Sequence, residues 1–150
     1  RKMTDTKSLY EKDYALWLDR TIANLKERKL DSIDWENLIE EVESLGKSEK
    51  RELSNRLTTL LEHCLKLCYT NYESDYRGWK DTIRRSQREI KKLLITSPSL
   101  KNYWYETFAE CYRDALSLLQ ESKDYQQFTF PQECPFPIDP DRLLNDTFWE

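Results

Sequence analysis

Arg56 and His63 are the two side chains of this 150-residue chain whose types and spacing best suit chemistry on a phosphodiester, and His63 is its single histidine. If the segment that holds them is helical, seven residues make two turns. Both side chains then project from one face, about 10 Å apart along the axis. At that separation they can grip one phosphodiester only from its two ends. The alternative is that both flank the apolar stripe of Leu57, Leu60 and Cys64 and hydrogen-bond to a neighbouring helix.

The spacing of Arg56 and His63 is similar to the Arg-x(4 to 6)-His signature of the higher-eukaryote and prokaryote nucleotide-binding superfamily, whose all-α members include metal-independent ribonucleases. This resemblance implies that His63 acts as a general acid or base and that Arg56 holds the phosphate. Any chain with a histidine and many arginines meets this pattern often. We therefore assign no catalytic residue on it and keep both as candidates.

Charge is segregated between two stretches of the chain. Residues 31–45 hold six acidic and no basic residues, whereas residues 76–92 hold seven basic and two acidic residues. On a helical wheel, five cations of the second stretch fall within about one quadrant: Arg77, Lys80, Arg84, Arg88 and Lys91. Such a face suits RNA or an acidic partner. The alternative is pairing with the acidic stretch, within the chain or in a dimer.

Two further polar residues lie at the margin of apolar stripes. Glu41 borders one stripe, and Gln87 falls on the apolar side of another, where a buried amide needs hydrogen-bond partners. Because boundary positions on packed helices converge, we expect Glu41, Arg56, His63 and Gln87 to share a partly enclosed polar cluster. Such a cluster serves either as a binding pocket or as a network that sets the register of the helices.

The thiols of Cys64 and Cys68, beside His63, do not match a metal site. Structural zinc uses paired short cysteine spacings on loops, and carboxylate bundles use Glu-x-x-His, whereas Leu60 stands three residues before His63. Glycine-rich phosphate loops and nucleophile elbows do not occur in the sequence. We therefore expect neither a metal nor a cofactor.

Helices must position all of these residues. With only two glycines and five prolines, and with 35% charged residues, the chain lacks the turns of a β-sandwich and the apolar runs of a parallel sheet. We expect an all-α, single-domain bundle of about five helices. Apolar periodicity predicts them over about 8–29, 35–45, 49–69, 77–96 and 98–122, with a short turn over 139–144. Gly46 is expected to end the second helix.

The two ends of the chain differ from this pattern. Residues 125–150 combine prolines with phenylalanines, which predicts an extended tail that wraps the bundle. Residues 1–7 are expected to be flexible. The N-terminal residues lack the apolar core of a signal peptide, and the longest apolar runs fall far short of the roughly 20 residues of a membrane span. We expect a cytoplasmic protein without membrane association.

Five segments carry a resemblance to a known family: residues 10–17 (YEKDYALW), 34–46 (DWENLIEEVESLG), 79–83 (WKDTI), 97–100 (SPSL) and 134–136 (CPF). In order and content they resemble a bacterial, largely cyanobacterial, helical family catalogued as domain of unknown function number twenty-nine. The resemblance implies a compact cytoplasmic helical bundle and brings no assigned activity. The chain departs from the family pattern at Leu67 and Gly78, where tryptophan and serine are usual.

A net charge of −4 excludes a globally basic nucleic-acid binder and leaves two hypotheses. The leading hypothesis is a protein-interaction or regulatory module without catalytic activity, which binds a protein partner or a second copy of itself. The alternative is a small metal-independent ribonuclease or RNA-binding protein that uses Arg56 and His63 with the basic helix 77–92. The candidate binding residues are Glu41, Gln87, Arg77, Lys80, Arg84 and Arg88.

Overall fold

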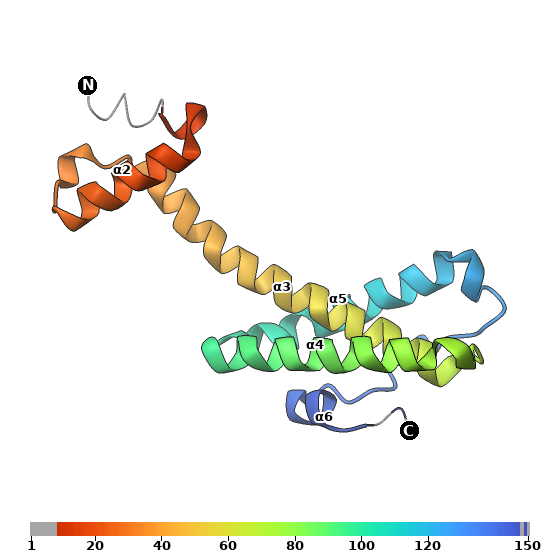
Figure 1. Cartoon of the computed structure of the whole chain (residues 1–150). Helices are drawn as coiled ribbons and strands as arrows, with labels where there is room; N and C mark the ends of the chain where they lie inside the picture. Colours follow the sequence, from red (N-terminus) through yellow and green to blue (C-terminus); the bar gives the residue numbers. More distant parts are fainter. Residues whose placement is uncertain (1–8, 148, 150) are drawn as a thin grey trace. The chain divides into compact units, whose positions relative to one another are not determined.

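A computed structural model describes residues 9–147 and 149, which form helices joined by connections with no strand among them (Figure 1). This confirms the predicted all-α class. The α-helices are α2 (Tyr14–Lys26), α3 (Trp35–Tyr69), α4 (Tyr76–Thr96), α5 (Leu100–Glu121) and α6 (Pro140–Asn145). Three short 3-10 turns stand between them: η1 (Leu30–Ser32), η2 (Glu73–Asp75) and η3 (Lys123–Tyr125). The segment expected to be flexible, residues 1–7, lies outside the described residues.

The chain, which we expected to form one domain, divides into two compact units, residues 1–48 and 49–150. The first unit contains α2, η1 and residues 35–48 of α3. The second unit contains the rest of α3 and every later element. In the described part of the chain, no helix combines the length and the apolar composition that a membrane crossing requires.

The first unit is built around Trp17 and Ile33, both completely buried. Asp13 begins α2 as its N-cap, because its carboxylate accepts a hydrogen bond from the backbone N–H of Leu16 at 3.1 Å. Asp34 plays the same part for α3, since its carboxylate accepts from the N–H of Asn37 at 3.4 Å. Asp34 is therefore the residue that begins α3.

An arginine in the left-handed conformation ends α2. Arg28 has a positive φ of 59°. Its backbone N–H bonds to the carbonyl of Leu25 at 3.2 Å, and that of Lys29 bonds to the carbonyl of Asn24 at 2.9 Å. These two bonds form a Schellman motif, which usually places glycine at the left-handed position. Here an arginine bears the strain of that conformation.

The prediction that Gly46 ends a helix is wrong. α3 continues through this residue for a total of 35 residues, and neither glycine of the chain has a positive φ. Glycine closes a helix only where the backbone turns left-handed. In the helix interior it costs about 1 kcal/mol relative to alanine, too little to interrupt a long helix. The second and third predicted helices are therefore one.

The core of the second unit lies between α3, α4 and α5 and is covered by the C-terminal segment (Figure 1). From α3, seven residues are buried: Leu53, Leu57, Leu60, Leu61, Cys64, Leu65 and Leu67. They include Leu57, Leu60 and Cys64 of the expected apolar stripe. α5 adds the completely buried Trp104 and Ala115. Phe130 and Phe136 of the tail, together with Leu143 of α6, belong to the same cluster.

Three buried side chains donate hydrogen bonds to backbone carbonyls of the C-terminal segment. The Tyr112 hydroxyl donates to Pro131 at 2.6 Å, and the Trp104 indole donates to Ile138 at 2.7 Å. The Gln87 amide donates to Leu143 at 3.0 Å. These bonds, together with the buried phenylalanines, hold the segment on the second unit.

Candidate functional site

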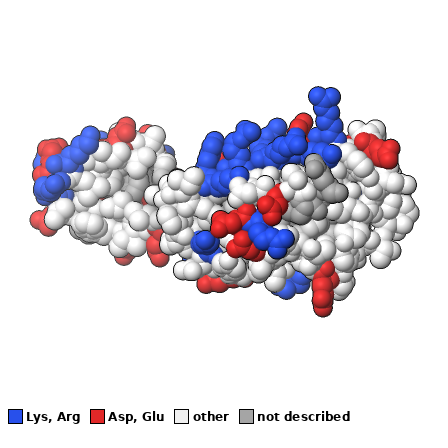
Figure 2. Space-filling view, turned by 90° about the horizontal axis from the view of Figure 1, so that it is seen from below, with Lys and Arg blue, Asp and Glu red and all other residues white. Residues whose placement is uncertain are grey.

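The outer face of α4 carries the densest group of positive charges in the second unit. The helix buries Ile83, Ser86, Gln87 and Ile90 toward the core. With the apolar residues on one side, the cations fall on the other side. Figure 2 shows them as a continuous blue band along one edge of this unit.

We call this surface the basic face; its members are Arg77, Lys80, Arg84, Arg85, Arg88, Lys91 and Lys92. Six of them are exposed, and Lys80 is half-buried. Lys92 pairs with Glu89 at 3.5 Å. With residues 9–147 and 149 considered, the other six make no ion pair. The basic face therefore carries positive charge that the described residues of its own unit do not pair with.

The basic face is long enough to meet an extended anionic surface. Arg77 and Lys91 are fourteen residues apart, which is about 21 Å along a helix. All members but Arg85 and Lys92 were predicted to share a quadrant. The same 3.6-residue period places these two on the adjacent side of the helix. The structure thus brings the predicted residues Arg77, Lys80, Arg84 and Arg88 together on one exposed surface.

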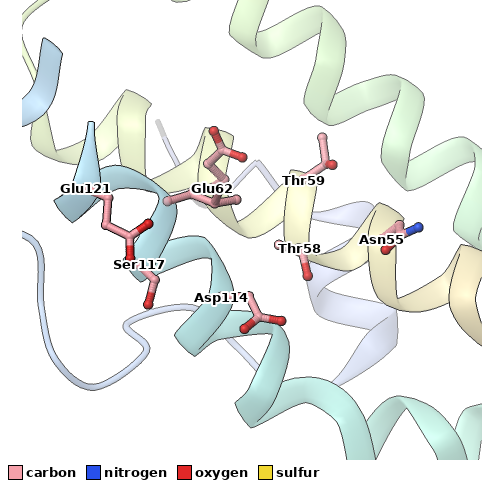
Figure 3. Close-up of a pocket in the computed structure, with 8 residues that line it drawn as sticks. Asn55, Thr58, Thr59, Glu62, Asp114, Ser117 and Glu121 are labelled. Atoms are coloured by element: carbon pink, nitrogen blue, oxygen red, sulfur yellow. The ribbon is translucent and has the colours of Figure 1, made fainter. Parts of the chain in front are cut away.

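A second candidate is a groove of about 490 Å³ between α3 and α5 (Figure 3). It is lined by Asn55, Thr58, Thr59, Glu62, Asp114, Ser117, Leu118 and Glu121. The lining comes from positions i, i+3, i+4 and i+7 of each helix. This groove was not predicted, although the recurrence of polar residues at that spacing is its signal in the sequence.

The groove is lined by three carboxylates, which accept hydrogen bonds, and by hydroxyl and amide groups, which both donate and accept them. Figure 3 shows the Glu62 carboxylate on α3 across from those of Asp114 and Glu121 on α5. Glu62 is paired with Lys66 at 3.2 Å. The Lys66 ammonium also lies 5.5 Å from the ring centre of Trp79. One of the three carboxylates is therefore already neutralised within the unit.

His63 and Arg56 lie on α3 and are both half-buried. Nδ1 of His63 lies 2.8 Å from the carbonyl of Thr59. Because a carbonyl only accepts, Nδ1 carries the proton, and the other ring nitrogen keeps a lone pair. Burial lowers the pKa of His63, so the ring is neutral at pH 7. A neutral ring of this kind is able to accept a proton, but neither His63 nor Arg56 lines the groove.

Glu41 lies in the first unit, where both of its carboxylate oxygens are engaged by tyrosines. Tyr10 donates its hydroxyl to Oε2 at 2.6 Å, and Tyr14 donates to Oε1. The two hydroxyls lower the pKa of Glu41, since they stabilise its charged form. The same bonds raise the pKa of Tyr14 and raise that of Tyr10 to about 12.

Of the four residues expected in one polar cluster, Glu41, His63 and Gln87 have separate partners. Glu41 bonds to Tyr10 and Tyr14, His63 bonds within its own helix, and Gln87 bonds to the carbonyl of Leu143. Gln87 is buried and satisfied, as its position required, but by the backbone of α6. The structure therefore joins these residues in no common network of hydrogen bonds among the residues it describes.

Metal-ligating side chains are dispersed in the described ranges 9–147 and 149. No group of three or more His, Cys, Asp or Glu residues there is placed to hold a metal ion. All four cysteines are free thiols, and burial raises the pKa of Cys64, Cys68 and Cys134.

This chain matches a known protein family. The family model described as domain of unknown function DUF29 matches residues 9–149. The chain belongs to the DUF29 family. The match spans both units, and it agrees with the resemblance carried by the five sequence segments. No curated protein and no solved structure matches the chain.

Several residues that carry the DUF29 resemblance here serve to build the fold. Asp13 caps α2, and Trp17 donates its indole N–H to Asp34 at 3.3 Å. Ser97, from the SPSL segment, donates to Glu49 at 3.0 Å. These contacts give three of the five segments, 10–17, 34–46 and 97–100, a structural role.

Proposed function

We propose that this DUF29 protein is a protein-interaction module without catalytic activity, and that its basic face binds an acidic partner. The observation that supports this proposal is the set of six cations on α4 that make no ion pair with a described residue. Such charges repel one another, so an anionic partner lowers the free energy of the surface it covers. The chain as a whole has a net charge of −4, so this face is a local concentration of positive charge on an acidic protein.

Arginine-rich composition supports a protein partner further. Four of the seven cations are arginines: Arg77, Arg84, Arg85 and Arg88. The planar guanidinium binds a carboxylate through two parallel hydrogen bonds. Acidic side chains on a folded partner are therefore suitable ligands for this face.

The experiment compares two charge-reversal variants of the full chain. The first carries Arg84→Glu, Arg88→Glu and Lys91→Glu in the basic face. The matched control carries Arg51→Glu, Lys101→Glu and Lys123→Glu, which make the same change in net charge at exposed positions outside α4. Each protein is used to capture and identify binding proteins from the host cell. We expect one set of acidic proteins to be retained by the wild type and the control and lost by the first variant.

Two results would contradict the proposal. One is the capture of the same proteins by both variants, which would separate binding from the basic face. The other is recovery of RNA with the wild type and loss of the bound proteins after treatment with a nuclease. Raising the salt concentration is expected to weaken genuine binding, because exposed charges are screened within about 10 Å at 0.1 M salt.

RNA is the second candidate ligand, favoured by the length of the basic face. A row of cations about 21 Å long follows the backbone of a nucleic acid and makes affinity strongly dependent on salt. Trp79 and Tyr76, the aromatic residues of α4, are packed against the core rather than presented for stacking on bases. This arrangement gives RNA the weaker support.

Ribonuclease activity is tested directly at His63. Purified wild-type protein and His63→Ala are incubated with total RNA in the presence of a chelator. Cleavage by the wild type that is lost in His63→Ala would replace our proposal with the enzymatic alternative. We expect neither protein to cleave RNA.

A further inference from the structure

The first unit presents an exposed apolar surface on α3. Trp35, Ile39, Val42 and Leu45 have exposed fractions of 44%, 55%, 59% and 69%. At 3.6 residues per turn they lie within an arc of about 120°. Single exposed apolar residues are common on protein surfaces, but a contiguous row on one helix is typical of an interaction site.

Acidic side chains border this row. Glu36, Glu40 and Glu43 are exposed and occupy the adjacent side of α3. No lysine or arginine occurs from residue 31 to residue 45. We call the apolar row and these three carboxylates the acidic stripe.

The charge of the acidic stripe determines which surface is able to cover it. Two acidic stripes packed on each other would bring like charges together, which is unfavourable. The basic face has the opposite sign: the acidic stretch 31–45 has a formal charge of −6, and residues 76–92 have +5. The two surfaces are also similar in form, since each is one side of a single helix.

The basic face offers apolar contact as well as charge. The long aliphatic stems of arginine and lysine cover apolar surface while their charged ends reach the carboxylates beside it. Ile95, near the end of α4, is 79% exposed. By helical period it shares the side of α4 that carries Arg77, Arg84 and Arg88. An apolar side chain thus stands at one end of the row of cations.

We propose that the acidic stripe of one copy of this chain docks on the basic face of a second copy. This inference rests on the proposed function, because it names a second copy as one acidic partner of the basic face. If both contacts form between the same two copies, the result is a closed dimer. If each copy contacts two different copies, the result is a longer assembly. Apolar contacts between the acidic stripe and the arginine stems bury surface area, and the ion pairs determine which partner binds.

The experiment measures oligomeric mass by sedimentation and light scattering over a range of protein concentrations. It uses the full chain and two oppositely charged variants. One carries Glu40→Lys and Glu43→Lys in the acidic stripe, and the other carries Arg84→Glu and Arg88→Glu in the basic face. We expect the wild type to self-associate, each variant alone to associate at least tenfold more weakly, and an equimolar mixture of the two variants to regain association.

Restored association in the mixture is the decisive result, because each variant then offers the surface that the other needs. Leu45→Ser, which removes the most exposed apolar side chain of the acidic stripe, is expected to weaken association without changing charge. A wild type that stays monomeric at every concentration, or a mixture that fails to associate, would overturn the inference. If the basic face still captures an acidic protein in that case, the proposed function stands and only the second copy is removed as a partner.

Discussion

The indole N–H of Trp17 donates a hydrogen bond to the carboxylate of Asp34 at 3.3 Å, and both side chains are completely buried. The same carboxylate accepts from the side-chain amide of Asn37 at 2.6 Å. Asp34 therefore connects α2 with the first turn of α3. One residue both begins a helix and satisfies the buried donor of the central tryptophan of its unit.

Replacing Asp34 with alanine is expected to destabilise the first unit by about 2–4 kcal/mol. The change removes an N-cap, worth about 1 kcal/mol, and leaves the buried indole N–H without an acceptor, which costs about 1–3 kcal/mol. Hydrogen exchange of α2 measures the effect. Asp34→Asn is the intermediate variant, since its single amide oxygen replaces either the cap acceptor or the indole acceptor, and a smaller loss is expected. Equal protection of α2 in wild type and Asp34→Ala would contradict this role.

The bonds between Glu41 and the tyrosines predict a dependence of stability on pH at both extremes. Because the folded pKa of Glu41 is lowered, its contribution is present above the ordinary carboxyl pKa and is lost as the pH falls through the lowered value. For Tyr10, whose pKa is raised to about 12, the contribution is present below the ordinary phenol pKa of about 10 and lost as the pH rises through 12.

Glu41→Gln tests this pair of transitions. The variant removes the carboxylate, so the acid loss should shrink and Tyr10 and Tyr14 should ionise closer to pH 10. Phenolate absorbance follows the tyrosines. Tyr112 provides an internal control, because its pKa is raised to about 12 mainly by burial in the second unit and should not change. An unchanged titration in Glu41→Gln would refute the assignment.

Gly46→Ala is expected to stabilise the protein by about 0.5–1 kcal/mol. Alanine loses less backbone entropy than glycine in a helix, and a Cβ added at Gly46 meets no atom within 4 Å. Helical ellipticity and the midpoint of thermal unfolding report the change. Gly78→Ala, in α4, is the matched variant with the same open surroundings. A loss of helicity in Gly46→Ala would show instead that the helix ends there.

Phe130→Ala and Phe136→Ala are each expected to destabilise the second unit by about 3 kcal/mol or more, because each removes a buried ring from the core. Deleting residues 126–150 should cost more, since Tyr112, Trp104 and Gln87 would lose their carbonyl acceptors. Denaturant unfolding measures all three variants. The exposed Gln126→Ala is the control and should change stability by less than about 0.5 kcal/mol. Wild-type stability in the truncated chain would show that the segment is not part of the core.

The helices could be predicted because apolar periodicity is a local signal. The apolar stripe of Leu57, Leu60 and Cys64 and the buried side of α4 lie where the pattern placed them. The continuation through Gly46 could not be predicted in this way, because a glycine either closes a helix or continues it according to its φ. Arg28 presents the converse case, since it adopts the left-handed conformation that usually identifies glycine.

Hydrogen-bond partners were the least predictable feature of the candidate site. A helical wheel places Gln87 on the buried side of α4, but its acceptor is the carbonyl of Leu143, and backbone carbonyls have no signature in the sequence. Glu41 likewise has a predictable side and unpredictable partners in Tyr10 and Tyr14. The basic face could be predicted, because the residue types give its charge and the helical period gives its exposed side.

The exposed middle of α3 affects how cooperatively the chain unfolds. Between Val42 and Leu53 of this helix, which lie within the described residues, no side chain is buried. This stretch is held mainly by its main-chain hydrogen bonds, and short helical segments without packing are marginally stable in water. This stretch therefore couples the unfolding of one unit only weakly to the unfolding of the other. Residues 1–48 and 49–150 should melt as separate cooperative units, visible as two heat-absorption peaks in calorimetry.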